Sequence, residues 1–208
     1  MRIVIISDTH NKLSQISIPE GDLLIHCGDF CGHGTIDEVA RFSEQLAELP
    51  HRHKVVIAGN HDWPFERQNA AARAALENVV YLEDSGVSID GLKIYGSPWQ
   101  PEFMNWAFNL PRQSRELEDK WRCIPDGTDI LVTHGPPYRI LDATRFGQHA
   151  GCELLRRRVE EIKPRVHCFG HIHEAYGQEK RDGTLFVNAS VLNLWYRPQN
   201  KPVVVDLD

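Results

Sequence analysis

Five short polar motifs in this chain each follow directly on a run of apolar, mostly β-branched residues. The motifs are Asp8-Thr9-His10, Gly28-Asp29, Gly59-Asn60-His61-Asp62, His134-Gly135 and Gly170-His171-Ile172-His173. The preceding runs lie at 3–6, 23–25, 55–58, 130–132 and 166–169, and such runs are typical of buried strands. Ligand sites of open α/β sheets lie at the carboxyl ends of their strands. The sequence therefore predicts that five strands bring aspartate, histidine and asparagine side chains to one site.

Helical patterns alternate with these strands along the chain, which favours an α/β fold. Thr35 and Glu38 form a capping box, and apolar residues then recur at helical spacing until Pro50. Two more helices are expected at 70–76 and 155–162, and further strands at 92–95, 185–188 and 202–207. The last two strands follow a short Asp182-Gly183 turn, and we expect them at antiparallel sheet edges.

The length and composition favour a single domain that spans residues 1–208. A chain of 208 residues with 41% hydrophobic content can bury one sizeable core, and chains divide into domains only well above this size. Its sequence contains no repeat, low-complexity tract or linker. The net charge of -6 argues against binding of long nucleic acid through a basic surface, whereas a small phosphorylated substrate is compatible with it.

The cysteines and the hydropathy pattern indicate a cellular compartment. Five cysteines, an odd number without a Cys-x-x-Cys pair, argue against a disulfide framework. The first strand is expected to begin at Arg2 or Ile3, so we expect no signal peptide, and no apolar run approaches the roughly 20 residues that span a bilayer. We therefore expect a soluble cytoplasmic protein that does not bind membranes.

Seven side chains in the five motifs are candidate metal ligands: Asp8, His10, Asp29, Asn60, His134, His171 and His173. Carboxylate, imidazole and amide oxygen ligands suit Mn, Fe and Zn, and we expect Mn²⁺, with Fe or Zn as alternatives. Seven ligands are too many for one catalytic ion with an open position, but they fit two ions if a carboxylate bridges them. Two divalent ions, less two carboxylate charges and one hydroxide, leave a net positive charge that favours a phosphate ester.

The spacing of the ligands indicates which of them face the same cavity. Asp8 and His10 are two residues apart, as are His171 and His173, and residues at this spacing point to the same side of an extended strand. Glycine flanks several motifs, and it permits the sharp turns and close backbone approach that converging ligands require. Each pair can therefore share one cavity at a strand end.

The order of the motifs resembles that of the calcineurin-like metallophosphoesterase superfamily: Asp-x-His, Gly-Asp, Gly-Asn-His-Asp, an isolated His and Gly-His-x-His. This resemblance covers the chain from Asp8 to His173. A closer resemblance is to the small metallophosphodiesterases of the MPPED type. It rests on Ile94-Tyr95-Gly96-Ser97-Pro98-Trp99-Gln100-Pro101, His134-Gly135-Pro136-Pro137, Gly151-Cys152-Glu153, and Gly170-His171-Ile172-His173-Glu174 with Gly177 beyond.

The resemblance implies a four-layer α/β/β/α sandwich and a two-metal site. Asp8, His10 and His173 would hold the first ion, Asn60, His134 and His171 the second, and Asp29 would bridge them. A bridging hydroxide would attack phosphorus in line while Asn60 and the ions hold the phosphate oxygens. His61 would face the phosphoryl group and protonate the leaving oxygen, and Asp62 would orient the His61 ring.

Substrate contacts beyond the phosphate are less closely defined by the sequence. Residues 98–109 carry two tryptophans and two phenylalanines in an expected loop. Trp99 and Trp106 either form an aromatic wall that stacks on a planar substrate group or belong to a hydrophobic cluster that fixes the loop. His149 is a third candidate for a substrate contact, whereas His33 and Cys31 follow Asp29 and could approach the mouth and the metals respectively.

The function expected from these residues is a metal-dependent phosphodiesterase acting on small substrates, and the resemblance adds cyclic nucleotides as a substrate class. A phosphomonoesterase is an alternative reaction on the same metal centre. An interaction scaffold on the same fold is another alternative, although a site without catalytic activity would be expected to have lost metal ligands or His61. A nuclease acting on long DNA is disfavoured by the negative net charge. A homodimer is compatible with the sequence.

Overall fold

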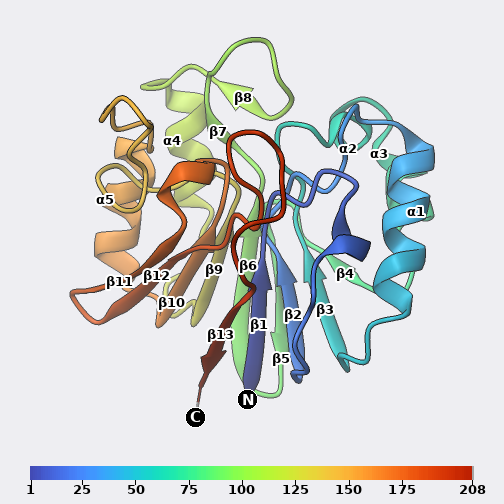
Figure 1. The fold of residues 1–208 in the computed structure, drawn as a ribbon. Helices are drawn as coiled ribbons and strands as arrows, with labels where there is room; N and C mark the ends of the chain where they lie inside the picture. The colour runs from blue at the N-terminus through green and yellow to red at the C-terminus, as the bar shows by residue number, and fades with distance from the viewer. Residues whose placement is uncertain (208) are drawn as a thin grey trace.

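Two β-sheets lie face to face in this protein, whose computed structural model describes residues 1–207 (Figure 1). The first sheet has the order β13 (Val203–Asp206), β1 (Arg2–Ile6), β2 (Leu23–His26), β3 (His53–Val56) and β4 (Val80–Tyr81). The second has the order β11 (Gly177–Arg181), β12 (Thr184–Asn188), β10 (Val166–Phe169), β9 (Ile130–Thr133), β6 (Leu92–Ser97) and β5 (Ser85–Ile89). The short strands β7 (Gln100–Pro101) and β8 (Asn109–Leu110) pair separately.

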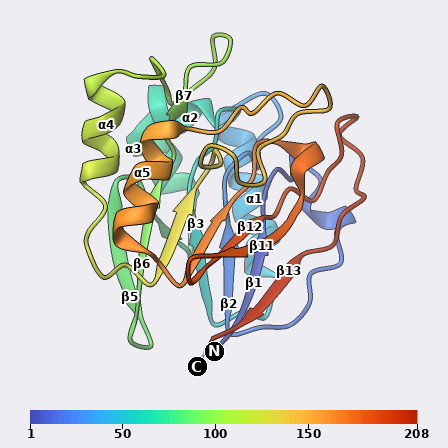
Figure 2. The same ribbon diagram turned by 90° about the vertical axis from the view of Figure 1, so that its left-hand side faces the viewer.

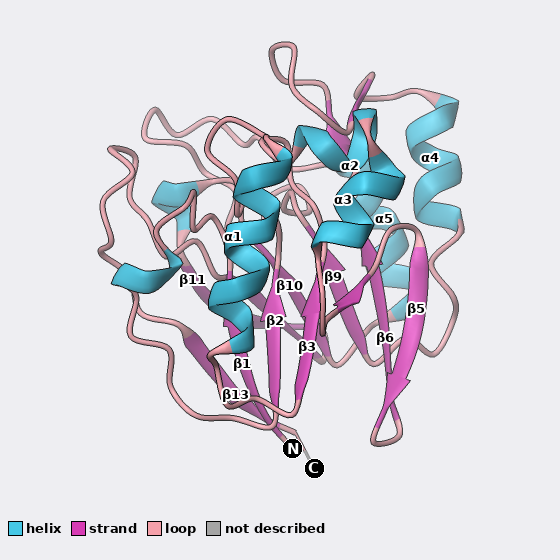
Figure 3. Cartoon of the chain, turned by 90° about the vertical axis from the view of Figure 1, so that its right-hand side faces the viewer, coloured by secondary structure: helices cyan, strands magenta, loops and turns pink. Residues whose placement is uncertain are grey.

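Helices cover the outer face of each sheet, so the molecule has four layers. Helices α1 (Ile36–Ala47), α2 (Trp63–Arg67) and α3 (Asn69–Ala75) cover the first sheet (Figure 3). Helices α4 (Arg115–Arg122) and α5 (Glu153–Ile162) cover the second (Figure 2). Single turns of 3-10 helix occur at Leu13–Gln15 and His173–Ala175. The expected α/β/β/α sandwich is confirmed.

The alternation of side chains along the strands explains why the layers form. Ile3 and Ile5 of β1 pack in the core between the two sheets, whereas Val4 and Ile6 pack against the helices. Successive side chains of a strand point to opposite faces, so a strand that is apolar on both faces needs a layer on each side. All of these side chains are at most 1% exposed, which makes β1 a central strand of the fold.

The capping box predicted at the start of α1 is present. The Thr35 hydroxyl accepts a hydrogen bond from the Glu38 amide at 3.2 Å, and the Glu38 carboxylate accepts one from the Thr35 amide at 2.9 Å. The same carboxylate accepts hydrogen bonds from the amides of Gly32 and His33. Glu38 therefore fixes both the first turn of α1 and the loop that leads from β2 toward the site.

The strands that carry the five polar motifs are parallel within each sheet. Strand β2 pairs in parallel with β1 and β3, and β10 pairs in parallel with β9. Their carboxyl ends therefore lie at one edge of the sandwich, the upper edge in Figure 1, opposite the N-terminus. The prediction that the five motifs meet at one edge follows from this parallel arrangement.

Some elements were not predicted or are placed differently. Strand β11 and helix α4 are mostly polar, and strand β5 is short, with only Val87 and Ile89 as large apolar residues. Strand β13 is an antiparallel edge strand as expected, but β12 lies between β10 and β11 and is not an edge. Among residues 1–207, no helix combines the length and the apolar character that crossing a bilayer requires.

Candidate metal centre

The structure brings the predicted ligands together in two groups at the carboxyl ends of the strands. Asp8, His10 and His173 each offer a ligand atom within 4.8 Å of the others, and we call this group the first site. Asp29, His134 and His171 form a second group by the same measure. The Asn60 side-chain oxygen lies 2.9 Å from Nε2 of His134, which places Asn60 in this second site.

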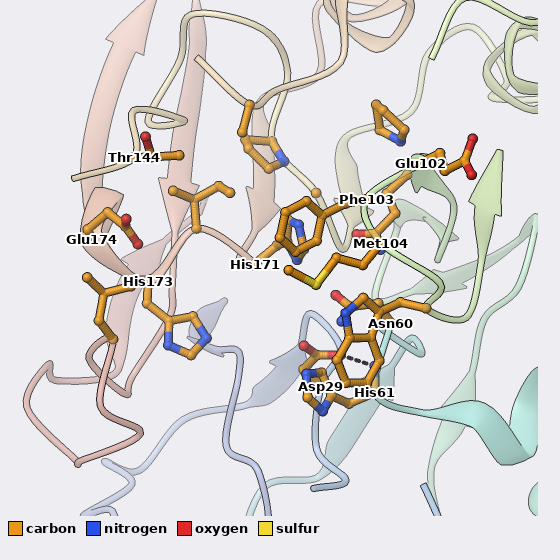
Figure 4. A pocket seen from close by; sticks show the side chains of 18 of the residues that line it. Asp29, Asn60, His61, Glu102, Phe103, Met104, Thr144, His171, His173 and Glu174 are labelled. Carbon is orange, nitrogen blue, oxygen red and sulfur yellow. Dashed lines mark hydrogen bonds between the residues drawn. The ribbon is translucent and has the colours of Figure 1, made fainter. Parts of the chain in front are cut away.

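Asp29 lies between the two sites. Its Oδ2 atom is 3.7 Å from Nε2 of His10 in the first site and 3.4 Å from Nε2 of His134 in the second. Its Oδ1 atom accepts a hydrogen bond from the His61 amide at 2.8 Å, which fixes the carboxylate (Figure 4). One carboxylate oxygen therefore faces both sites, which is the arrangement that a bridging ligand requires.

Backbone carbonyl groups orient three of the histidine rings. His10, His134 and His173 each place Nδ1 within 2.9–3.1 Å of a carbonyl oxygen, which belongs respectively to Cys31, Cys27 and Asn193. A carbonyl only accepts, so Nδ1 donates and Nε2 is the atom directed at the site. This second hydrogen bond is typical of histidine that ligates a metal.

The donor set fits divalent ions. Nε2 of His10 is buried and has no hydrogen-bond partner, although unpaired buried polar atoms are rare and costly. Imidazole nitrogens beside two buried carboxylates form a set that suits Mn, Fe or Zn. An ion at the first site would satisfy the His10 nitrogen and balance the charges of Asp8 and Asp29.

Several ligand residues have left-handed backbone conformations that side-chain-bearing residues rarely adopt. The φ angles are 57° at Asp8, 58° at Asp29, 38° at His10 and 67° at His171. Such conformations each cost on the order of 1–3 kcal/mol and persist where the surrounding structure enforces them. The strand ends are therefore held in strained turns that direct these side chains toward the site.

Two glycines allow the close approach of the ligand carboxylates to the backbone. A Cβ atom at Gly59 would lie 2.4 Å from Oδ1 of Asp29, and one at Gly170 would lie 2.1 Å from Oδ2 of Asp8. Neither space can hold a side chain, so these positions require glycine.

The electrostatics of the metal-free site leave both carboxylates charged. Burial alone would raise the pKa of Asp8, but the hydrogen bond and positive charge of His173 lower it below its usual range. Burial lowers the pKa of His10 to about 4 and that of His171 to about 3. Burial also opposes charge on His173, yet its contact with Asp8 raises that pKa to about 9. The Asp29 charge likewise outweighs burial at His134 and raises its pKa to about 9.

Comparison with known proteins identifies the family. The sequence model of the calcineurin-like phosphoesterase family matches residues 1–175. The chain belongs to this family. Metallophosphoesterase domain-containing protein 1 of Homo sapiens is 45% identical over 231 residues, which cover 99% of this chain and 71% of that protein. As a family member, this chain is a metal-dependent phosphoesterase, and the resemblance noted in its sequence is confirmed.

Solved structures of proteins with low sequence identity to this chain share its fold. Phosphopantetheinyl hydrolase of Mycobacterium tuberculosis has a TM-score of 0.66 at 15% identity, over 97% of this chain and 95% of that chain. GAP50, described as the anchor in the inner membrane complex of Plasmodium, has a TM-score of 0.53 at 10% identity, over 92% of this chain and 71% of that chain. At 10–15% sequence identity, these similarities show a shared fold and nothing about function.

In this phosphoesterase site, His61 is oriented by the backbone and not by Asp62, which corrects the role expected for Asp62. The Nδ1 atom of His61 lies 2.9 Å from the Gly32 carbonyl oxygen. The buried Asp62 carboxylate instead accepts hydrogen bonds from three backbone amides, those of Asp29, Cys31 and Gly59, at 2.7–2.9 Å. Asp62 therefore ties together the ends of β2 and β3, which carry the ligands.

A pocket of about 400 Å³ opens above the phosphoesterase metal centre. Trp106 lines it and stacks on His61, with ring centroids 4.1 Å apart. Phe103 is 52% exposed, and the centroid of its ring lies 6.1 Å from that of His171 (Figure 4). Of the aromatic segment 98–109, this part therefore forms a wall of the pocket.

Trp99 and His149, which were expected to contact substrate, are placed elsewhere in the structure. Trp99 packs against Phe108, and its indole nitrogen donates to Asp84, so it belongs to the alternative hydrophobic cluster. His149 lies outside the pocket wall and pairs with Asp142 at 2.7 Å. Trp99 is positioned by Asp84, which precedes it by 15 residues, and His149 by Asp142 seven residues before it, and neither contact has a signal in the local sequence pattern.

The side chains of His33 and Cys31, which follow Asp29, do not have the roles considered for them from the sequence. The His33 side chain is 92% exposed and lies 3.6 Å from Glu38. Burial raises the pKa of the Cys31 thiol, which keeps it protonated, and the contribution of Cys31 to the site is its carbonyl group.

Three residues of the loop 189–200 approach the metal centre and were missed in the sequence: Ser190, Asn193 and Tyr196. Ser190 comes two residues after strand β12, the same placement that identified the five motifs. Ser190 could therefore have been predicted from its position just after a strand. Asn193 acts through its backbone carbonyl, which carries no sequence signal.

Proposed function

We propose that this phosphoesterase is a phosphodiesterase that acts on small substrates such as cyclic nucleotides at two divalent ions, preferably Mn²⁺. The observation that carries the proposal is the position of Asp29, whose Oδ2 faces both His10 and His134. A complete set of ligands around a shared carboxylate supports catalysis at two ions, and His61 lies beside them in the pocket.

The residues of each site define where the ions would bind. Asp8, His10 and His173 would hold one, Asn60, His134 and His171 the other, and Asp29 both. When bound, the ions supply Lewis-acid stabilisation of the phosphate charge and activation of water for in-line attack.

His61 and Asn60 supply the chemistry of the protein itself. With Nδ1 donating to Gly32, His61 presents Nε2 to the pocket, where its protonated form can donate to the leaving oxygen. The Asn60 amide also lines the pocket and is placed to hold a phosphate oxygen. The leaving alkoxide then departs as an alcohol, and the proton comes from His61.

The pocket supports a nucleotide-sized substrate. Its volume of about 400 Å³ lies within the roughly 300–1,000 Å³ typical of small-molecule sites. Trp106 and Phe103 present aromatic faces on which a base can stack. The net charge of -6 does not support a long nucleic acid as the substrate.

A scaffold role is the second candidate, because GAP50, with the same fold, is described as an anchor. The complete ligand set and the positioned His61 favour catalysis instead. We also propose a single domain and a cytoplasmic location, which the five free cysteines support. A homodimer is compatible with the proposal.

The test combines metal analysis with a substrate screen. Protein reconstituted with excess Mn²⁺ should contain two ions per chain, and Asp29→Asn should weaken both because the bridge loses its charge. Phosphomonoesters, linear diesters and cyclic nucleotides are then compared by kcat/KM. Full activity with one ion would contradict the two-ion proposal, and a preference for monoesters would identify a phosphomonoesterase.

A further inference from the structure

The loop 189–200, between β12 and β13, lies beyond the residues that the family model matches. It passes over the carboxyl ends of the central strands (Figure 1). We propose that this loop controls the first site alone: Ser190 and Asn193 are positioning residues for Asp8 and His173 and not for the ligands of the second site. The inference rests on the proposed two-ion centre.

Ser190 fixes the Asp8 carboxylate. Its hydroxyl donates to Oδ2 of Asp8 at 2.7 Å, and both side chains are fully buried. The His171 amide donates to both carboxylate oxygens, at 3.0 Å to Oδ2 and 3.2 Å to Oδ1. The Ser190 hydroxyl fixes Oδ2, and Oδ1 lies 3.5 Å from Nε2 of His173.

Asn193 fixes the His173 ring. Its carbonyl oxygen accepts hydrogen bonds from Nδ1 of His173 at 3.0 Å and from the Tyr196 amide at 2.8 Å. Its side-chain oxygen accepts from the amides of Trp195 and Arg197 at 2.9 and 3.1 Å. One residue therefore closes the turn and aims the carbonyl at the ligand.

Tyr196 completes the cover of the first site. Its ring centroid lies 4.7 Å from that of His10 and 5.5 Å from that of His173. The backbone of Tyr196 has a φ of 56°, and its carbonyl oxygen accepts a hydrogen bond from Lys12. The loop thus contacts the three ligands that belong to the first site alone, Asp8, His10 and His173.

The second site is supported by other segments. The Cys27 carbonyl holds His134, the Ala107 amide donates to the Asn60 carbonyl at 3.2 Å, and Phe103 lies over His171. Within residues 1–207, the hydrogen bonds and ring contacts of loop 189–200 with metal ligands all go to the first site. Asp29 and the hydrogen bonds from the His171 amide to Asp8 join the two sites, but the loop 189–200 supports the first-site ligands and not those of the second site.

The experiment measures Mn²⁺ binding to the metal-free full chain by calorimetry. Ser190→Ala should weaken one of the two ions by about 10- to 100-fold, the usual effect of removing a partner of a ligand, and leave the other unchanged. Ser97→Ala is the matched control, because Ser97 is equally buried and donates to the carboxylate of Asp84, which is not a ligand. The control should bind both ions as wild type does.

Ligand variants assign the weakened ion to a site. In a His171→Ala background the remaining ion occupies the first site, and adding Ser190→Ala should weaken it. In a His173→Ala background the remaining ion occupies the second site, and Ser190→Ala should have no effect. Equal weakening in both backgrounds, or none in either, overturns the inference while wild type still binds two ions. Wild-type protein that binds fewer than two ions overturns the proposed function as well.

Discussion

The Nδ1 atom of His61 donates a hydrogen bond to the carbonyl oxygen of Gly32 at 2.9 Å. This contact fixes the ring so that Nε2 faces the pocket, and Trp106 stacks against the ring. The loop that contains Gly32 is in turn held by the Glu38 carboxylate at the start of α1. The orientation of the proposed proton donor therefore depends on a helix cap outside the pocket.

His61→Gln should retain both metals and lose general acid catalysis, worth about 10²–10⁴ in rate. Alkoxide and ribose leaving groups need a proton, so these substrates should suffer most, whereas nitrophenolate esters should suffer least. The measurement is kcat/KM for a leaving-group series in wild type and variant. If kcat/KM depends no more steeply on the leaving group in the variant than in wild type, His61 binds the phosphate without donating a proton.

Asp62→Asn should reduce stability without changing the leaving-group dependence. The replaced oxygen becomes an amide group that faces a backbone donor, and an unsatisfied buried donor costs about 1–3 kcal/mol. Urea unfolding measures the loss in the free energy of unfolding, and the leaving-group series measures how steeply kcat/KM depends on the leaving group. A slope that steepens as in His61→Gln would instead assign Asp62 to proton transfer.

Trp106→Ala should weaken nucleotide substrates by roughly 1–3 kcal/mol while affecting small alkyl diesters less, because it removes a stacking face from the pocket. Trp99→Ala is the control. It should lower the melting temperature through lost packing with Phe108 and leave KM unchanged. Equal loss on both substrate classes in Trp106→Ala would indicate that the ring only supports His61.

Loading the metal-free protein at pH 7.5 should release about two protons per chain from His134 and His173, in addition to a proton from any bound water that ionises to hydroxide. Burial opposes the charge of His134 and His173, but the neighbouring Asp29 and Asp8 raise each pKa to about 9, so both rings are charged before metal binds. Metal affinity should accordingly fall as the pH decreases below about 9. Calorimetry in two buffers of different ionisation enthalpy counts the protons, and His173→Gln should release one fewer. No release would show that both rings are neutral.

His167 should make the metal-free protein sensitive to acid. Burial lowers its pKa to about 3, whereas the unfolded chain titrates near 6.5, so the unfolded state binds more protons between these values. The free energy of unfolding should therefore fall as pH decreases through this window, by up to about 1.4 kcal/mol per pH unit for this group. His167→Gln should flatten the slope in chelator-treated protein, and an unchanged slope would contradict this assignment.

The central strands and the meeting of their motifs could be predicted because both signals are local. Each apolar run and its polar end lie within a few residues, and parallel pairing then places the ends at one edge. Strand β12 was predicted at an edge because its antiparallel partner β11 is polar and carries no clear strand pattern.

The roles of Asp62 and Trp99 could not be predicted because each depends on a distant contact. Asp62 is next to His61 in sequence, yet the turn directs its carboxylate to the amides of Asp29 and Cys31, more than 30 residues away. Trp99 shares a loop with Trp106, but its indole donates to Asp84. In both cases a neighbouring position in the sequence did not determine where the side chain points.

The hydrogen bond between Ser190 and Asp8 joins residues 182 positions apart. At roughly 5–20 residues per second, a ribosome makes Asp8 about 10–40 s before Ser190. During that interval the nascent chain already carries Asp8 and His10 without the loop that supports them. Each site also needs a histidine of the 171–173 motif, so neither ligand set is complete until most of the chain has been made, and the support of Asp8 by Ser190 comes last.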